Sequence, residues 1–236
     1  MDSQQGDPEG CREFPDHAGA EDVSPDTEEK GSEMKPEDRE ESLDRKLNIH
    51  TVGRDDAFED DHHFPYEPTP YAVLELLADS GWIGEENLLV DYGCGKGRAS
   101  FYLSSATGCR SIGVDFNEGF IAAAEQNRRD YRGDGSRIAF FCEGAERYEV
   151  PEDADRFYFF NPFSEKVLQS VIGKILESWY RRPRHLLLMF YYPSDEYIAA
   201  LMNVEELDFL DEIDCSELFP GDRRERILCF EAEGVC

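Results

Sequence analysis

From residue 66 onward, apolar residues fall into two alternating patterns. Short continuous apolar runs that end at turn-forming residues predict buried strands at 87–92, 110–116, 137–142, 156–160 and 185–192. Apolar residues at helical spacing before, between and after these runs predict helices over 69–80, 98–107, 118–131, 164–180 and 195–202. Two further strands are predicted at 208–214 and 225–231, separated by the turn-rich sequence FPGDRR.

This regular alternation of strands and helices predicts an α/β fold. We expect a doubly wound, mostly parallel seven-stranded sheet with helices on both faces. The last two strands lack an intervening helix, so they are predicted to form a C-terminal antiparallel hairpin. Ligands of such sheets bind beyond the carboxyl ends of the strands, near the point where the strand order reverses.

The first 49 residues have a different composition. Asp, Glu, Ser, Gly and Pro crowd together in stretches such as EDVSPDTEEK, with almost no apolar periodicity. Such a segment buries too little apolar surface to offset chain entropy. We therefore predict a disordered acidic tail at 1–49 and a single domain at 50–236.

Acidic residues dominate the charge of the chain. There are 53 acidic and 24 basic residues, which gives a net charge of -29. A field of this sign repels phosphate backbones and anionic lipid headgroups. Nucleic acid is therefore a disfavoured substrate, and no membrane partner is expected. A local basic cluster remains possible at Arg181, Arg182 and Arg184, although a solvated helix end is the preferred interpretation.

Cysteine usage favours a reducing compartment. The chain has seven cysteines but no CxxC pair, no signal peptide is recognisable, and no apolar run is long enough to cross a bilayer. A cytoplasmic location is therefore predicted. The adjacent His62 and His63 lie close to Asp60 and Asp61, but neighbouring side chains on a loop seldom converge on one ion. No metal site is predicted.

The predicted strand at 87–92 ends in a glycine turn with the sequence DYGCGKG. Glycines at alternating positions allow positive φ and a close approach of a ligand to the backbone, and the following helix offers free N–H groups. The spacing does not fit a Walker loop, GxxxxGK[ST], or the dinucleotide pattern GxGxxG. A second acidic residue, Asp115, ends the next strand 24 positions after Asp91. A carboxylate there can accept hydrogen bonds from both ribose hydroxyls of an adenosine.

Two stretches resemble a known family. LLVDYGCGKG and SIGVDFN are similar to the glycine motif and the ribose-binding strand of class I, seven-strand S-adenosylmethionine-dependent methyltransferases. The resemblance covers about residues 66–231 and implies S-adenosyl-L-methionine as the cofactor. By position, it implies that Asp91 orients the methionine portion and that Asp115 holds the ribose. The floor of the cofactor site would be formed by Gly93, Gly95 and Gly97.

The same resemblance is weaker at the adenine end of the cofactor. Many relatives place Gly-Asp-Ala after the third strand, with the acid near the adenine amine, whereas this chain has Cys-Glu-Gly-Ala-Glu at 142–146. Gly144 stands where the acid is expected. The side chain of Glu146 or the backbone of Ala145 is the candidate to bind the adenine edge, and a surface-loop glutamate is an equal alternative.

The acceptor side is predicted to follow the fourth strand. The sequence Asn161-Pro162-Phe163 resembles the (N/D)PP(Y/F) motif of amine-methylating members, with one proline instead of two. In that motif the Asn side chain and the proline carbonyl accept hydrogen bonds from the target nitrogen, and the aromatic ring packs against the acceptor. Methyl transfer is a direct displacement that depends mainly on proximity and alignment. The alternative is a tight turn in which Asn161 or Ser164 caps the next helix.

A proline-rich segment precedes the first predicted helix of the domain. It contains YEPTP, and similar YxPTP stretches form a lid over the cofactor in seven-strand lysine methyltransferases. Tyr66 and Thr69 are therefore candidate cofactor contacts, with a plain proline-ordered connector as the alternative. Tyr191 and Tyr192 end the fifth strand at the same sheet edge and are candidates to line the acceptor pocket.

These patterns favour a methyltransferase that transfers a methyl group to nitrogen, with a protein side chain or a small amine as the acceptor. A catalytically inactive cofactor-binding module is one alternative. An O-methyltransferase of a small molecule is another, although oxygen or carbon methylation normally needs a positioned base or metal, for which there is no clear candidate.

Overall fold

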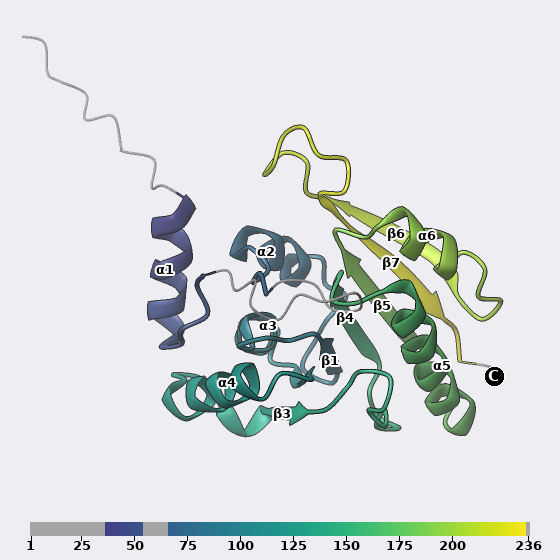
Figure 1. The fold of residues 1–236 in the computed structure, drawn as a ribbon, viewed down its shortest axis with the longest axis horizontal. Helices are drawn as coiled ribbons and strands as arrows, with labels where there is room; N and C mark the ends of the chain where they lie inside the picture. Colours follow the sequence, from purple (N-terminus) through teal and green to yellow (C-terminus); the bar gives the residue numbers. More distant parts are fainter. Residues whose placement is uncertain (1–35, 54–65, 235–236) are drawn as a thin grey trace, which may run out of the picture. The chain divides into compact units, whose positions relative to one another are not determined.

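The computed structural model describes residues 36–53 and 66–234 of the chain. Within these residues, seven strands form one sheet in the order β3-β2-β1-β4-β5-β7-β6 (Figure 1). The strands are β1 (Leu88–Tyr92), β2 (Arg110–Asp115), β3 (Ile138–Cys142), β4 (Arg156–Phe160), β5 (Leu186–Tyr191), β6 (Asp208–Asp214) and β7 (Arg226–Ala232).

The first five strands are parallel, and β7 pairs antiparallel with both β5 and β6. Strand β1 lies between β2 and β4, so the direction of strand progression reverses at β1. The carboxyl end of β1 is therefore the topological switch point, where ligands of doubly wound sheets bind. The glycine turn begins at this point.

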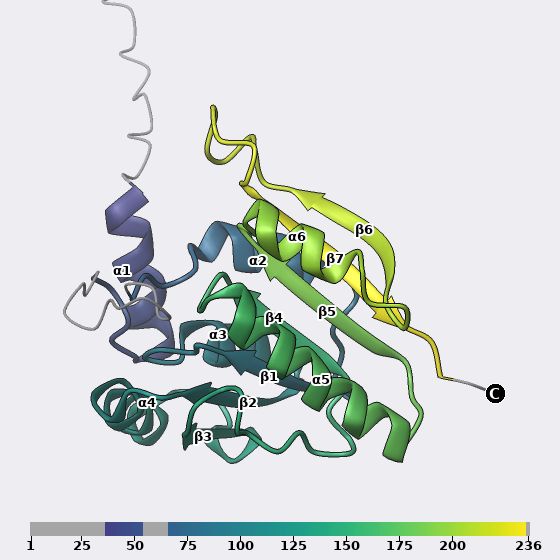
Figure 2. The same cartoon turned by 45° about the vertical axis from the view of Figure 1, so that its right-hand side comes forward.

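Helices cover both faces of the sheet (Figure 2). They are α1 (Pro36–Leu47), α2 (Tyr71–Asp79), α3 (Arg98–Thr107), α4 (Glu118–Asp130), α5 (Glu165–Arg181) and α6 (Asp195–Leu201). Residues of α2, α3 and α4 pack with Leu89 in one apolar cluster, and residues of α5 and α6 pack with Leu88 and Val90 in another. Consecutive residues of β1 thus serve opposite layers, as the alternation of side chains along a strand requires.

The predicted fold class is confirmed. Every predicted strand and helix is present, with bounds that differ by at most two residues, and the β6–β7 hairpin is antiparallel as expected. None of the described helices is both long and apolar enough to span a bilayer. The guanidinium of Arg184, from the candidate basic cluster, donates hydrogen bonds to backbone carbonyls, including that of Ala154 at 2.7 Å.

The predicted boundary between tail and domain is different in the structure. Residues 36–47 form α1, whose Leu47 is buried in the core with Ile49. The Asp44 carboxylate is also buried and accepts hydrogen bonds from the Thr51 hydroxyl at 2.7 Å and the Tyr71 hydroxyl at 2.6 Å. The domain therefore includes α1. The rest of the predicted tail, residues 1–35, lies outside the described residues.

Candidate functional site

The glycine turn is held at the switch point by the neighbouring strand. The backbone N–H groups of Gly93 and Cys94 donate to the carbonyl of Val114, at 2.8 and 3.2 Å. The turn has positive φ at Gly93, Gly95 and Gly97, with values of 73°, 52° and 90°. A side chain at these positions is strained whatever space surrounds it.

The three glycines are also crowded by other residues. A Cβ atom on Gly93 would lie 2.4 Å from Cβ of Pro162, and one on Gly97 would lie 2.7 Å from the ring of Phe140. Only glycine allows both the backbone conformation and these contacts. The turn is therefore packed tightly between β3 and the segment that follows β4.

Asp115 lies at the carboxyl end of β2, beside the turn. Its Oδ2 accepts a hydrogen bond from Gly95 N at 2.9 Å, and its Oδ1 accepts one from Asn117 N at 2.9 Å. Asn117 in turn caps α4 by accepting from the backbone N–H groups of Gly119 and Phe120. The carboxylate is thus held in a fixed position at the pocket edge.

Asp91 lies on the other side of the turn and is almost completely buried. It accepts a hydrogen bond from the Ser100 hydroxyl at 2.8 Å. Burial, opposed by the hydrogen bonds from Ser100 and reinforced by the charge of Asp115, raises the pKa of Asp91 to about 7. Its ionisation therefore responds to a nearby charge at neutral pH.

Tyr66 and Thr69 form the roof of the site. The Tyr66 ring lies against Gly95 and packs with Phe120 at 4.9 Å between ring centroids, while its hydroxyl donates to the Thr51 carbonyl at 2.7 Å. The Thr69 hydroxyl is 3.0 Å from the hydroxyl of Tyr158 on β4. The YEPTP segment therefore packs against the glycine turn and is hydrogen-bonded to β4.

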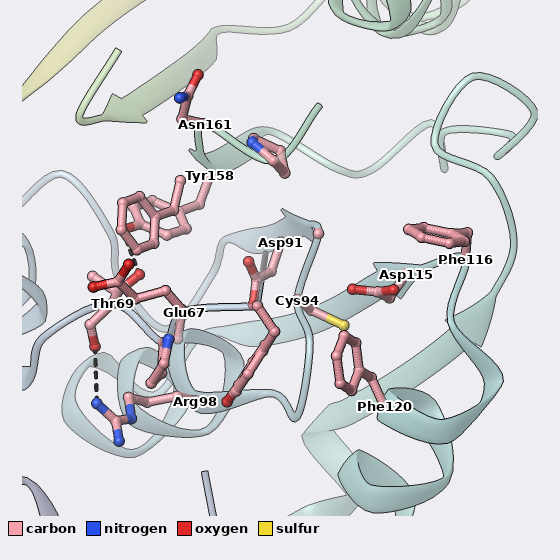
Figure 3. A pocket seen from close by; sticks show the side chains of 16 residues that line it. Glu67, Thr69, Asp91, Cys94, Arg98, Asp115, Phe116, Phe120, Tyr158 and Asn161 are labelled. Atoms are coloured by element: carbon pink, nitrogen blue, oxygen red, sulfur yellow. Dashed lines mark hydrogen bonds between the residues drawn. The ribbon is translucent and has the colours of Figure 1, made fainter. Parts of the chain in front are cut away.

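The turn after β4 approaches the glycine turn through Pro162. Asn161 has a φ of 39°, an uncommon value for a residue other than glycine, and its buried Oδ1 has no hydrogen-bond partner among the described residues. The Asn161 side chain points away from Asp91 and Asp115 (Figure 3). Ser164, and not Asn161, occupies the N-cap position of α5.

A narrow pocket of about 80 Å³ joins these elements (Figure 3). The residues predicted from the sequence that line it are Asp91, Gly93, Asp115, Tyr66, Thr69, Asn161 and Pro162. Gly95 and Gly97 lie beneath the aromatic side chains that cover them. The pocket thus brings together five of the nine predicted cofactor residues and two of the three predicted acceptor residues.

Three predicted site residues lie elsewhere. Phe163 is only 3% exposed, and its ring packs edge-on against Phe159 in the core, so it is not available to an acceptor. Ala145 packs against the cluster beneath α5 and α6, and Glu146 lies beside Arg147 with 40% of its side chain exposed. Neither Ala145 nor Glu146 is among the residues that line the pocket.

Other pocket residues were not predicted from the sequence. Phe116 and Phe120 line the Asp115 side, and Glu67 and Arg98 line the opposite side together with Tyr158 (Figure 3). Phe116 is 41% exposed and directly follows Asp115, the candidate for ribose binding. Its position in the sequence could therefore have identified it as a pocket residue. Its flat apolar face suits a nucleobase. Arg98 had no local signal, because its partners are distant in sequence.

In the part of the chain that the structure describes, no group of three or more His, Cys, Asp or Glu side chains is arranged to hold a metal ion. His62 and His63, weighed as metal ligands from the sequence, lie outside the described residues.

Comparisons with known proteins agree with this geometry. Residues 89–183 match the family model of a methyltransferase domain. No curated protein is significantly similar in sequence. The [4+2]-cyclase SpnF is 14% identical with a TM-score of 0.56, and the match covers 85% of this chain and 97% of SpnF. An RNA methyltransferase from Salinibacter ruber, solved with S-adenosyl-L-homocysteine, is 15% identical with a TM-score of 0.51, over 72% of this chain and 96% of that one.

A third similar structure is the O-MT segment of StiE, with 13% identity, a TM-score of 0.51, and coverage of 70% of this chain and 74% of that one. At such low identities these similarities establish the fold and leave the reaction open, as the presence of a cyclase illustrates. The matched residues 89–183 include the glycine turn, Asp115 and Asn161. Residues 89–183 thus match a methyltransferase domain, and the chain has a seven-stranded, Rossmann-like fold.

Proposed function

We propose that this protein is an S-adenosylmethionine-dependent methyltransferase that methylates a nitrogen atom. The observation that carries the proposal is the contact between Pro162, in the turn after β4, and Gly93, in the glycine turn. It places a backbone suited to the cofactor and a segment that resembles an amine-binding motif around one pocket.

The residues present fit S-adenosylmethionine. The glycine turn has positions that a Cβ atom would fill, Asp115 is fixed at the carboxyl end of β2, and the next residue, Phe116, also lines the pocket. In the proposal Asp115 holds the ribose, Phe116 packs on the adenine, and Asp91 attracts the cationic methionine end. When bound, this cofactor supplies a methyl group activated by a sulfonium.

The chain's own groups then select the acceptor. The carbonyl of Pro162 and the side chain of Asn161 are hydrogen-bond acceptors, so they orient an N–H group and leave its lone pair directed into the pocket. The unpartnered Oδ1 of Asn161 supports this role, because a buried oxygen without a donor is costly and a ligand N–H relieves that cost. Asn161 must rotate its side chain toward the pocket to serve in this way.

Other acceptors are weaker candidates. The Salinibacter ruber neighbour acts on RNA, and the StiE neighbour carries the label O-MT. The net charge of -29 opposes an RNA substrate. Oxygen methylation calls for a base close to the acceptor, and of the carboxylates that line the pocket Asp115 accepts a hydrogen bond from Gly95 in the turn and Asp91 accepts one from Ser100 of α3.

Calorimetric titration with S-adenosylmethionine tests the first step. We expect binding to the full chain and at least a tenfold loss in Asp115→Ala, about 1.4 kcal/mol. Absence of binding to the folded wild-type protein would sink the proposal. Asn161→Ala is expected to retain cofactor binding and lose turnover, measured as transfer of labelled methyl groups to fractionated cell extract. Label found on oxygen after hydrolysis of the product would refute the nitrogen acceptor.

A further inference from the structure

A second cavity lies beside the pocket, and we call it the outer groove. Its volume is about 640 Å³, and it shares the lining residues Glu67, Pro68 and Arg98 with the pocket. Its other walls come from α1, from residues 52–53, from the start of α2 and from the β6–β7 loop. Segments that are distant in sequence therefore form it jointly.

The outer groove meets the pocket on the side away from Asp115. Glu67 and Arg98 lie on the side of the pocket opposite Asp115 and Phe116, and Tyr158 lies on the same side as Glu67 (Figure 3). A molecule in the groove therefore approaches the end of the pocket away from the proposed ribose site. Its reactive group would enter past Glu67.

Apolar side chains form much of the groove surface. Val52 is 44% exposed and Leu218 is 39% exposed, and both line the groove with Pro68 and Pro70. Exposed apolar side chains gathered in a concave surface mark a binding site more often than scattered ones do. The groove thus offers contacts to apolar side chains of a ligand.

Carboxylates outnumber guanidinium groups on the same surface. The charged residues that line the groove are Glu37, Arg39, Glu40, Glu67 and Arg98. Both cations already have carboxylate partners, since Arg39 pairs with Glu75 and Arg98 pairs with Glu40. The groove therefore presents an apolar floor with a net negative rim, on a chain whose net charge is -29.

From this combination we propose that the outer groove binds a basic peptide segment of a protein substrate and presents a lysine amine to the pocket. The inference rests on the proposed function and specifies its acceptor. Charge complementarity selects the occupant, because acidic ligands and nucleic acids are repelled by the rim. The protein's own first 35 residues are excluded on the same ground, since they hold 11 acidic and 3 basic residues.

The size of the groove distinguishes a peptide from a small amine. A free amine is bound within the pocket and gains nothing from a groove of about 640 Å³ that is lined by Leu218 and Phe219. A peptide fills the groove with residues on either side of the lysine, so its affinity depends on the groove side chains. This difference gives the test.

The probe is a fluorescein-labelled peptide with lysine and leucine residues in a glycine-serine background, titrated with the full chain and followed by anisotropy. A matched peptide has glutamate in place of lysine. We expect binding of the lysine peptide, weakening at about 0.5 M salt, and no binding of the glutamate peptide. Failure of the lysine peptide to bind the wild-type protein overturns the proposal.

Two variants and two matched controls locate the binding. Leu218→Ser and Glu37→Lys are expected to weaken peptide binding about fivefold or more. Leu210→Ser is the first control, because Leu210 is also 39% exposed but does not line the groove. Glu165→Lys is the second, because Glu165 is likewise an exposed acid in the first turn of a helix. Equal weakening in a variant and its control overturns the proposal.

Cofactor titration separates the two levels of inference. S-adenosylmethionine is expected to bind all four variants as it binds the wild-type protein, since none of these residues lines the pocket. If S-adenosylmethionine binds but peptide binding does not depend on the groove residues, the lysine peptide is refuted as the acceptor, and the proposed methyltransferase function stands. Loss of cofactor binding in the wild-type protein removes the proposed function itself. A short RNA that binds more weakly to Leu218→Ser than to Leu210→Ser also refutes the peptide as occupant.

Discussion

The phenol ring of Tyr66 lies directly on Gly95, so that a Cβ atom on Gly95 would be 2.2 Å from Cε2 of Tyr66. Lys96 Nζ lies over the Tyr66 ring, 4.7 Å from the ring centroid, and the Tyr66 hydroxyl donates a hydrogen bond to the Thr51 carbonyl. The roof of the pocket and its floor are therefore in contact, and a change at either residue is transmitted to the other.

Gly95→Ala is expected to destabilise the fold by about 2–4 kcal/mol. About 1–2 kcal/mol comes from the left-handed backbone and the remainder from the collision with Tyr66. Urea unfolding measures the change. Gly81→Ala is the matched control, because Gly81 has a similar positive φ of 77° but no atom within 4 Å of its Cβ position.

The collision itself is tested by removing the ring. In a Tyr66→Ala background the Gly95→Ala substitution is expected to cost no more than Gly81→Ala. If the full cost of Gly95→Ala persists in that background, the contact with Tyr66 does not account for it.

Arg98 follows the glycine turn and is only 3% exposed. Its Nε donates to the Thr51 hydroxyl at 2.7 Å, its guanidinium pairs with Glu40, and Nη2 lies 3.7 Å from Oδ1 of Asp44. Arg98→Met leaves two carboxylates without their buried cation, which costs about 3–5 kcal/mol.

The expected loss for Arg98→Met is measured by urea unfolding. Arg128→Met serves as the control, because Arg128 pairs with Glu125 on a partly exposed face of α4, and its loss is expected to change the unfolding free energy by less than about 1 kcal/mol. Equal effects of the two substitutions would show that burial adds nothing to the Arg98 interactions.

Helix α1 shows what the sequence could not reveal. Its twelve residues, PEDREESLDRKL, have little apolar periodicity, and the side chains that bind it to the domain include Glu40 and Asp44. Their partner, Arg98, is 58 residues from Glu40 in sequence. Because α1 is ordered by a cation so distant in sequence, its own composition is that of a disordered tail, and the sequence alone predicts disorder.

Where signals were local, prediction succeeded. The strands are apolar runs with turn residues at their ends, and the glycine turn with Asp115 is recognisable from spacing alone. Side-chain direction was less predictable, because the burial of Phe163 depends on Phe159 and on Tyr197 of α6. The candidate residues identified from the sequence therefore lie at the switch point, but the sequence did not identify which neighbours face the pocket.

Removal of α1 is expected to destabilise the domain. A chain that begins at Met34 keeps α1. A chain that begins at Asn48 lacks Leu47 in the core and both carboxylates that interact with Arg98. If this costs about 3 kcal/mol, the melting temperature falls by roughly 6–12 °C for a domain of this size. Equal melting temperatures of the two chains would contradict the structural role of α1.

The raised pKa of Asp91 makes its contribution to the free energy of unfolding fall with rising pH. Its pKa in the folded protein is about 7, above the ordinary value of about 3.9 for the unfolded chain, because burial disfavours the charged carboxylate and Asp115 adds repulsion. Between these two values the folded state binds more protons than the unfolded state. The contribution of Asp91 therefore lowers stability as the pH rises from about 4 to 7, by at most about 4 kcal/mol.

Comparison with Asp91→Asn isolates this contribution, since the amide stays neutral and its oxygen still accepts from the Ser100 hydroxyl. The stability of wild type relative to Asp91→Asn is expected to fall between pH 4 and 7 and to remain constant above about pH 8, measured by urea unfolding. Asp134→Asn is the control, because the hydrogen bonds from Ser136 lower the pKa of Asp134 and confine its effect to more acidic pH.

The same carboxyl group links pH to the proposed cofactor. S-adenosylmethionine is cationic, so its binding favours the ionised form of Asp91, and its affinity for the wild-type protein is expected to rise as the pH increases through about 7. Asp91→Asn should lack this rise and bind the cofactor more weakly at pH 8. Parallel affinity profiles of the two proteins, measured by calorimetry from pH 6 to 8, would show that Asp91 does not sense the cofactor's charge.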